Sequence, residues 1–169
     1  TPDVREVANY VRTMEYGLDR LKTLPVSGRL VREIHEHLMK GVRGGHATPG
    51  EFRRTQNWIG PPGCTLMQAT FVPPPVEGMN AALSEWEKYL NEGPREPPLI
   101  QCALMHYQFE AIHPFDDGNG RIARALTDML LAQSDKSTQR FYSMSAQIRR
   151  ERKQYYKILE QTQEKINLS

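Results

Sequence analysis

One stretch of this chain gathers side chains that could bind a phosphorylated ligand and move a proton. It runs His-Pro-Phe-Asp-Asp-Gly-Asn-Gly-Arg-Ile-Ala-Arg from His113 to Arg124. Glycines let backbone N–H groups approach a ligand closely, and the N-terminus of a following helix favours an anion. Arg121 and Arg124 are three residues apart, so both lie on one face of the first helical turn, where guanidinium groups can bind phosphate oxygens.

Two other side chains of this stretch could complete a reaction site. Asp117 would lie beside the phosphates, and such a carboxylate is the usual protein ligand for Mg²⁺. His113 is the group here whose ordinary pKa suits a general base near neutrality. Asp-Gly, Asn-Gly and His-Pro pairs are also common in turns and at helix ends, so each feature alone is more often structural. Their combination at this spacing favours a loop that holds a magnesium nucleotide against a proton acceptor.

The stretch resembles the signature of the Fic domain family, His-Pro-Phe-x-(Asp/Glu)-Gly-Asn-Gly-Arg-x-x-Arg, at every defined position. The resemblance implies a protein adenylyltransferase, which moves AMP from ATP onto a Thr, Ser or Tyr hydroxyl of a target protein and also onto itself. The related Doc branch, which phosphorylates its target, departs from the Gly-Asn-Gly part. Because this chain keeps Gly118-Asn119-Gly120, the resemblance favours AMP transfer.

Chemistry and resemblance together imply a role for most residues of the motif. His113 would take the proton from the attacking hydroxyl, and Asp117 would hold Mg²⁺ between the α- and β-phosphates of ATP. The Asn119 side chain would be available to the α-phosphate, and Phe115 would anchor the loop from below. The expected phosphate-binding residues, through backbone N–H groups or guanidinium groups, are Gly118, Asn119, Gly120, Arg121 and Arg124. Asp116 has no assigned role.

Composition excludes several classes of protein. The chain has 169 residues with 38% hydrophobic and 25% charged side chains, which suits one globular domain over 1–169 with a real core. A net charge of +2 is too small to imply a nucleic-acid surface, and no apolar run reaches membrane-spanning length. Cys64 and Cys102 do not form a disulfide framework. We therefore expect a cytoplasmic protein that contacts neither nucleic acid nor membrane.

Apolar residues recur at helical spacing through most of the chain. The expected helices cover roughly 1–21, 27–41, 75–91, 99–112, 121–130 and 145–166. The first carries an apolar stripe of Val4, Val7, Ala8, Val11, Met14, Leu18 and Leu21. The fold class we predict is all-α, a compact Fic-type bundle around helices 99–112 and 121–130, with one short β-hairpin as its only sheet.

The hairpin falls between residues 42 and 75, where turn residues interrupt the helical period. Strand-like runs at 56–59 and 66–72 predict a hairpin with its tip at 60–65. The segment resembles the target-docking flap of the family, here about 56–75, which would hold a target protein. The resemblance rests on Gly50-Glu51-Phe52-Arg53, Trp58-Ile59-Gly60 and Phe71-Val72-Pro73-Pro74. It also places Ala69, Thr70 and Phe71 beside the nucleotide.

Three histidines and one tyrosine outside the motif could also carry function. His35 and His37 point in different directions on one helix, so we expect surface or edge residues rather than a metal pair. His106 is expected to be a core histidine satisfied by a hydrogen bond, because no third metal ligand has a suitable spacing. Tyr155 resembles a family tyrosine that lines the adenine pocket. Family members often have an asparagine eight positions later, where this chain has Gln163.

Three further expectations concern the surroundings of the domain. Thr1 is not an initiator methionine and helical periodicity runs nearly to Ser169, so we expect a fragment of a longer protein. Many Fic domains are restrained by (Ser/Thr)-x-x-x-Glu-(Gly/Asn), whose glutamate pairs with the second motif arginine, here Arg124. This chain lacks that motif, and the resemblance implies an inhibitory helix in cis upstream of Thr1 or in trans on a partner. A homodimer is left open.

Two alternative functions remain at this point. The same loop could transfer another phosphate-containing group, such as UMP, phosphocholine or phosphate. The domain could also be a non-enzymatic docking module, although the intact His113, Asp117 and arginines argue against it.

Overall fold

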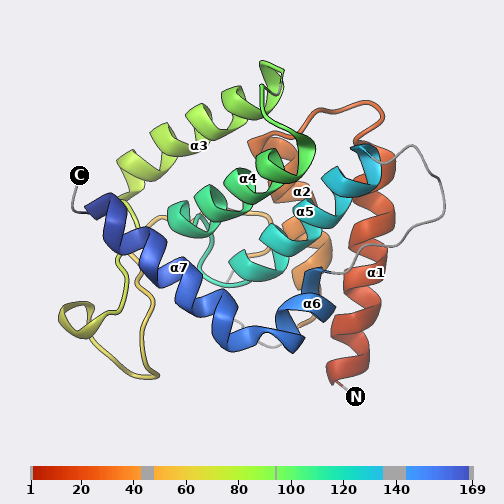
Figure 1. The fold of residues 1–169 in the computed structure, drawn as a ribbon. Coiled ribbons are helices and arrows are strands. Elements are labelled where there is room, and N and C mark those ends of the chain that lie inside the picture. Colours follow the sequence, from red (N-terminus) through yellow and green to blue (C-terminus); the bar gives the residue numbers. More distant parts are fainter. Residues whose placement is uncertain (1, 43–47, 94, 135–143, 168–169) are drawn as a thin grey trace.

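The computed structural model describes residues 2–42, 48–93, 95–134 and 144–167, which form a helical protein (Figure 1). The α-helices in chain order are α1 (Pro2–Arg20), α2 (Gly28–Met39), α3 (Val76–Asn91), α4 (Pro98–Ile112), α5 (Asn119–Ser134), α6 (Met144–Arg150) and α7 (Arg152–Asn167). A short 3₁₀ helix, η1, covers Leu66–Gln68. The all-α prediction is confirmed, and the expected helices agree closely with the observed ones except at the C-terminal end.

Helices α4 and α5 lie side by side at the centre, joined by the loop that carries the motif (Figure 1). Helix α3 packs against α4, and α1 packs against both α2 and α5. The fully buried apolar side chains come mainly from α2, α4, α5 and the loop between the last two: Leu30, Ile34, Met105, Phe109, Phe115, Ile122, Leu126 and Met129. Each such side chain contributes roughly 1.5–3 kcal/mol to folding. The loop is therefore anchored in the core through Phe115.

Local sequence explains where the helices around the site begin. The hydroxyl oxygen of Ser27 accepts a hydrogen bond from the backbone N–H of Leu30 at 3.3 Å and caps α2, as the sequence predicts. Pro98 is the first residue of α4, where a missing N–H group costs nothing.

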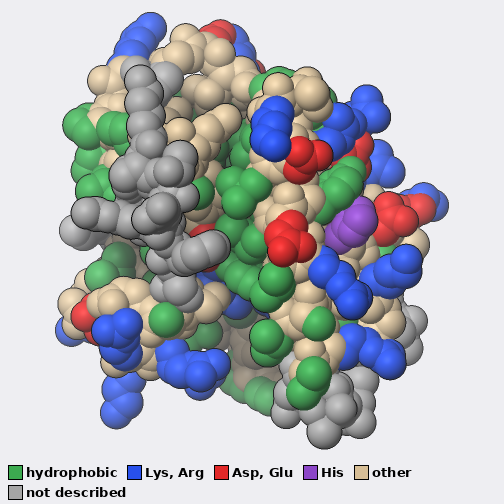
Figure 2. Space-filling view, turned by 90° about the vertical axis from the view of Figure 1, so that its right-hand side faces the viewer, with side chains coloured by type: hydrophobic (Ala, Val, Ile, Leu, Met, Phe, Trp, Pro, Cys, Tyr) green, Lys and Arg blue, Asp and Glu red, His purple; other side chains and the backbone are tan. Residues whose placement is uncertain are grey.

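Helix α1 turns much of its apolar stripe outward. Figure 2 shows hydrophobic side chains gathered in a band on the face that α1 contributes, and the exposed ones on this helix are Val4, Val7, Val11 and Leu18. Of the stripe, Met14 and Leu21 pack against the core. The packed side also uses small and polar residues: Gly17 lies so close to Met129 that a β-carbon would be 2.3 Å from its methyl carbon, and the Asn9 amide donates to two carbonyls at the end of α2. The stripe therefore marks the packed face of α1 only in part.

The flap doubles back as predicted, but it is held by little regular structure. One antiparallel bridge joins Ile59 and Phe71, and no longer ladder forms among the described residues. The strand predicted over 66–72 is wrong at Leu66–Gln68, which form η1. The Gln68 side-chain oxygen accepts the N–H of Thr65 at 3.1 Å and closes this turn. The prolines at 73–75 cannot donate to a ladder, so the pairing ends there.

The C-terminal segment forms two helices where the sequence predicts one. Helices α6 and α7 meet at Glu151. Helix α6 packs against α5, and α7 contacts α4 through Tyr155, whose hydroxyl lies 2.9 Å from Nε2 of His106. Thr1, at the start of the helix expected over 1–21, lies outside the described residues. Within these ranges, none of the helices combines the length and hydropathy needed to cross a bilayer.

Candidate active site

His113 ends α4 in a conformation that L-residues avoid. Its φ is 49°, in the left-handed region, and its N–H donates to the Phe109 carbonyl at 3.0 Å. Glycine usually occupies this place at a helix end, and another residue costs about 1–2 kcal/mol there. The Arg53 guanidinium donates to the His113 carbonyl at 2.9 Å and holds the turn. The fold thus tolerates strain at the position where the sequence places an imidazole.

The His113 ring is held in its neutral form. Burial lowers its pKa to about 4, the nearby Glu110 carbonyl raises it, and the charge of Arg53 lowers it further. Nδ1 is buried and has no hydrogen-bond partner among the described residues. At neutral pH the imidazole therefore carries one proton and can accept another, as a general base must.

Asn119 locks the loop rather than facing a ligand. Its side-chain oxygen accepts the N–H of Phe115 at 2.8 Å, and its amide nitrogen donates to the Phe115 carbonyl at 2.7 Å. The residue is 2% exposed. Its side chain, which we expected to meet the α-phosphate, is thus committed to the loop, and its backbone N–H is the group left for a phosphate.

Two glycines of the motif are required by close contacts. Gly118 has φ +86°, and a β-carbon there would lie 3.1 Å from the sulfur of Met39 and 3.3 Å from Nε2 of His35. A β-carbon on Gly120 would lie 3.0 Å from Nη1 of Arg124 and 3.3 Å from an oxygen of Glu110. Side chains at either position would push apart the groups that form the loop.

The start of α5 presents an anion-binding surface. The N–H groups of Asn119, Gly120 and Arg121 have no acceptor in the described part of the chain. Arg121 forms an ion pair with Asp117 at 3.0 Å. The Arg124 Nε donates to the Ser145 hydroxyl at 3.2 Å, and among the described residues no carboxylate pairs with Arg124. Free N–H groups at a helix N-terminus and an arginine without an ion pair favour a phosphate here.

The predicted metal ligand Asp117 is suitably placed. Its side chain is 49% exposed, and one oxygen accepts the N–H of Gly118 at 2.6 Å. The described residues contain no group of three or more potential metal ligands. Mg²⁺ commonly takes one or two carboxylates together with substrate phosphates and water, so a single carboxylate fits this ion.

His35 is a positioning residue that the sequence reading missed. It is 1% exposed, so the expectation of a surface or edge histidine is wrong. Nδ1 accepts the N–H of Gly50 at 2.9 Å, which makes Nε2 the donor to the Asp117 carbonyl at 3.0 Å. The ring also stacks on Phe115 with centroids 3.7 Å apart. A usable signal was its spacing from the buried Val31 and Leu38, which places all three on one face of α2.

Arg53 is the second residue whose role was missed. It is 2% exposed and donates to the carbonyls of His113, Thr55 and Pro74. One guanidinium therefore joins the turn at His113 to both ends of the flap. The Gly-Glu-Phe-Arg run marked this position in the sequence, but no local pattern gives the carbonyls that it contacts.

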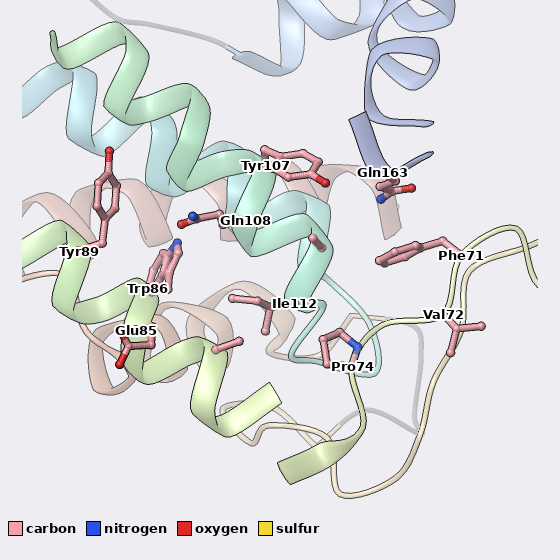
Figure 3. A pocket seen from close by; sticks show the side chains of 12 residues that line it. Phe71, Val72, Pro74, Glu85, Trp86, Tyr89, Tyr107, Gln108, Ile112 and Gln163 are labelled. Atoms are coloured by element: carbon pink, nitrogen blue, oxygen red, sulfur yellow. The ribbon is translucent and has the colours of Figure 1, made fainter. Parts of the chain in front are cut away.

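A pocket of about 650 Å³ lies between the flap, α3, α4 and the end of α7, and Ile112, the residue before the motif, is among its lining residues. Figure 3 shows Phe71 from the flap and Gln163 from α7 on the same side of this pocket, with Tyr107 from α4 nearby. This volume suits a small-molecule ligand. Phe71 was predicted to lie beside the nucleotide, and Gln163 stands where family members often have an asparagine; both side chains line this pocket.

Ala69, Thr70 and Tyr155, which were also predicted to contact the nucleotide, are not among the lining residues of this pocket. The N–H of Thr70 donates to Ile59 and that of Ala69 to Leu66, so both are used within the flap. Tyr155 lines a neighbouring apolar crevice of about 410 Å³ between α4, α5 and α7. Its hydroxyl lies 2.9 Å from Nε2 of His106. The prediction of a hydrogen-bonded core histidine at 106 is confirmed, and the adenine role of Tyr155 stays a prediction.

The sequence of this chain matches a known protein family over the segment that builds the site. The chain belongs to the Fic/DOC family, whose sequence pattern matches residues 25–131. That range includes the flap, α4, the loop and most of α5. The predicted family membership is therefore confirmed.

Named relatives of this chain agree with its membership of the family. The chain is 31% identical over 144 residues to the protein adenylyltransferase Fic of Drosophila grimshawi, covering 82% of this chain and 26% of that protein. It is 35% identical over 107 residues to the protein of the same name from Culex quinquefasciatus, covering 60% of this chain and 19% of that protein. Among solved structures, a Fic family protein from Desulfovibrio desulfuricans G20 superposes with a TM-score of 0.79 at 25% identity, covering 98% of this chain and 47% of that one.

Proposed function

We propose that this domain is a protein adenylyltransferase that moves AMP from Mg·ATP onto a Thr, Ser or Tyr hydroxyl of a target protein. The observation that carries the proposal is the neutral His113 imidazole, fixed in a strained turn beside a helix N-terminus with free N–H groups. The names of the curated relatives support ATP as the donor and a protein as the acceptor.

The polar groups of the motif divide the chemical tasks in this proposal. His113 takes the proton of the attacking hydroxyl as that oxygen approaches the α-phosphorus. The N–H groups at the start of α5 hold the phosphates, while Arg121 and Arg124 hold the β- and γ-phosphates and stabilise departing pyrophosphate. Asp117 would hold Mg²⁺, which would offset negative charge on the phosphates. Because Asp117 and Arg121 pair with each other in this structure, binding of the magnesium nucleotide exchanges that ion pair for contacts with ligand.

The flap offers one backbone position to an extended target segment. The N–H and carbonyl of Phe71 both bond to Ile59, and the carbonyls of Pro73 and Pro74 accept from Gln56 and Arg53. Val72 is the residue of 71–74 whose N–H and carbonyl have no partner among the described residues. It is 47% exposed. A target strand pairing with Val72 would gain two main-chain hydrogen bonds close to the pocket.

The proposal includes a regulatory contact at Arg124. A restraining glutamate, upstream of Thr1 or on a partner, would find Arg124 without an ion pair in the described residues. That restraint, a homodimer and a cytoplasmic location stay predictions.

Labelled ATP tests the reaction type. The protein is incubated with Mg·ATP labelled first at the α-phosphate and then at the γ-phosphate, and label retained on the denatured chain is counted. AMP transfer predicts retention from the α-position alone. Retention from the γ-position would favour phosphate transfer, and nucleotide binding without retained label would favour a docking module.

A further inference from the structure

Arg124 is bound by a hydroxyl group although two carboxyl groups flank it. Its Nε donates to the Ser145 hydroxyl at 3.2 Å. An oxygen of Glu110 and Nη1 of Arg124 lie 3.3 Å and 3.0 Å from the same point, where a β-carbon on Gly120 would be. Burial raises the pKa of Asp128, one turn further along α5, and the charge of Arg124 is close enough to lower it. Neither carboxyl group forms an ion pair with Arg124 in the described part of the chain.

The place of Ser145 is set by the buried side chain of Asp128. Asp128 is 3% exposed, and its Oδ1 accepts the N–H of Met144, the first residue of α6, at 3.0 Å. Ser145 is the next residue along the chain, so this bond fixes where its hydroxyl meets α5. The side chain that could have paired with Arg124 is therefore used to hold the partner that Arg124 has instead.

A tyrosine of α1 occupies the other oxygen of Asp128. The Tyr10 hydroxyl donates to Oδ2 of Asp128 at 2.9 Å. Burial and Asp128 raise the pKa of Tyr10, and a hydrogen bond with Ser145 lowers it, so the tyrosine hydroxyl also lies near Ser145. Both oxygens of Asp128 thus have donors other than Arg124. A connected set of polar contacts runs from α1 through α5 and α6 to the guanidinium group.

We propose that Tyr10 and Ser145 are positioning residues of the nucleotide site, which act through Asp128 to orient the Arg124 guanidinium toward the terminal phosphates and away from the flanking carboxyl groups. This inference rests on the proposed function, which assigns Arg124 to the β- and γ-phosphates. Because Ser145 uses Nε, the two Nη groups of Arg124 are left for phosphate oxygens. A guanidinium that is already oriented loses less freedom when the ligand binds.

Ser145→Ala tests the contact nearest to the ligand. Calorimetry in the presence of Mg²⁺ gives the Kd of ATP and the Kd of AMP. We expect the Kd of ATP to rise roughly tenfold, because a hydrogen bond to a charged group is lost and the guanidinium can turn toward Glu110. AMP lacks the phosphates assigned to Arg124, so its Kd should stay the same. Partial unfolding would weaken the binding of both ligands equally, so the ratio of the two Kd values reports positioning rather than stability.

Tyr10→Phe tests the distant end of the same set of contacts. The ring stays and the hydroxyl is lost, so the Kd of ATP should rise about threefold while the Kd of AMP stays the same. Tyr16→Phe is the matched control on the same helix. Its hydroxyl donates to Glu33 at 2.8 Å, a carboxylate that pairs with Arg20 rather than with Arg124. The ATP to AMP ratio should not change in this control.

Arg124→Met separates positioning from a local disturbance of α6. In this background the guanidinium is gone and ATP binds through its remaining contacts, so Ser145→Ala and Tyr10→Phe should cause no further change. The same rise in Kd with and without Arg124 would overturn the proposal. Unchanged ratios in both single variants, with ATP still bound, would overturn this inference alone. Absence of ATP binding by the wild type would overturn the proposed function as well.

Discussion

The loop before α5 and the flap face the same site, yet they are held in opposite ways. The loop is fixed from every side: Phe115 is fully buried and stacked on His35, and Asn119 bonds its backbone twice. The flap has one bridge, and Met67 at its outer end is 92% exposed. A reacting group needs exact placement, whereas a surface that fits a protein partner gains from adaptability. Rigid chemistry and adaptable recognition are thus divided between two neighbouring segments.

His113→Ala should have the largest effect, because it removes the proposed general base from the rigid loop. General-base catalysis is worth about 10²–10⁴-fold, so AMP transfer should fall by that factor while the Kd of ATP stays nearly the same. Transfer rates and calorimetry measure the two quantities. His37→Ala, at an exposed histidine of α2, is the control. Wild-type rates in the His113 variant would remove the imidazole from the mechanism.

Arg53→Met should be next, since Arg53 links the rigid loop to the flap. It leaves buried carbonyls without donors, at about 1–3 kcal/mol for each, so the free energy of unfolding should fall by roughly 3 kcal/mol. Urea denaturation measures this. The neighbouring Arg54, whose side chain is 82% exposed, gives the matched control Arg54→Met, with a change within about 0.5 kcal/mol. Similar losses in both variants would mean that Arg53 does not join the two segments.

Acid should weaken the rigid region through its buried histidines. Burial lowers the pKa of His106 and His113 to about 4, below the unfolded value of 6.5, so the unfolded chain binds protons first as the pH falls. Stability is therefore present above pH 6.5 and is lost as the pH falls toward 4. Each histidine should account for roughly 2 kcal/mol between pH 7 and pH 5.

Urea denaturation at the two pH values measures this loss. His106→Gln should lower the acid loss by that amount, and His37→Gln should leave it unchanged. Equal stability of the wild type at pH 7 and pH 5 would contradict the burial of these neutral rings.

Val72→Pro should have the smallest effect, because it touches one hydrogen bond of the adaptable segment. Proline removes the N–H that we assign to a target strand, worth about 0.5–1.5 kcal/mol, so modification of a target should fall roughly 2- to 10-fold. Val72→Ala keeps the N–H and is the matched control, and ATP binding should be the same in both. Equal modification by the two variants would place the target elsewhere. Proline at Ala69 or Thr70 is a poorer probe, since their N–H groups are used within the flap.

The sequence predicts the parts of this molecule that depend on local pattern. Helix positions follow from apolar spacing and from caps such as Ser27, and the 113–124 motif identifies the family. The stripe on α1 had the right period but marked the packed face only in part, at Met14 and Leu21. Packing at Gly17 depends on close contact between helices, and apolar periodicity does not report that contact.

The rest depends on contacts between distant segments. His35 and Arg53 reach carbonyls that lie 82 and 60 residues away in the chain, at Asp117 and His113. Leu66–Gln68 has strand-like composition, but the turn closed by Gln68 and the prolines that follow prevent a ladder. In each case tertiary structure decided what local propensity left open.

Intact mass spectrometry after incubation with Mg·ATP tests the central claim most directly. The account predicts that the wild-type protein gains the mass of one or more AMP groups, that the His113→Ala variant gains none, and that both bind ATP. A gain equal to a phosphate group, or an equal gain of AMP in both proteins, would contradict it.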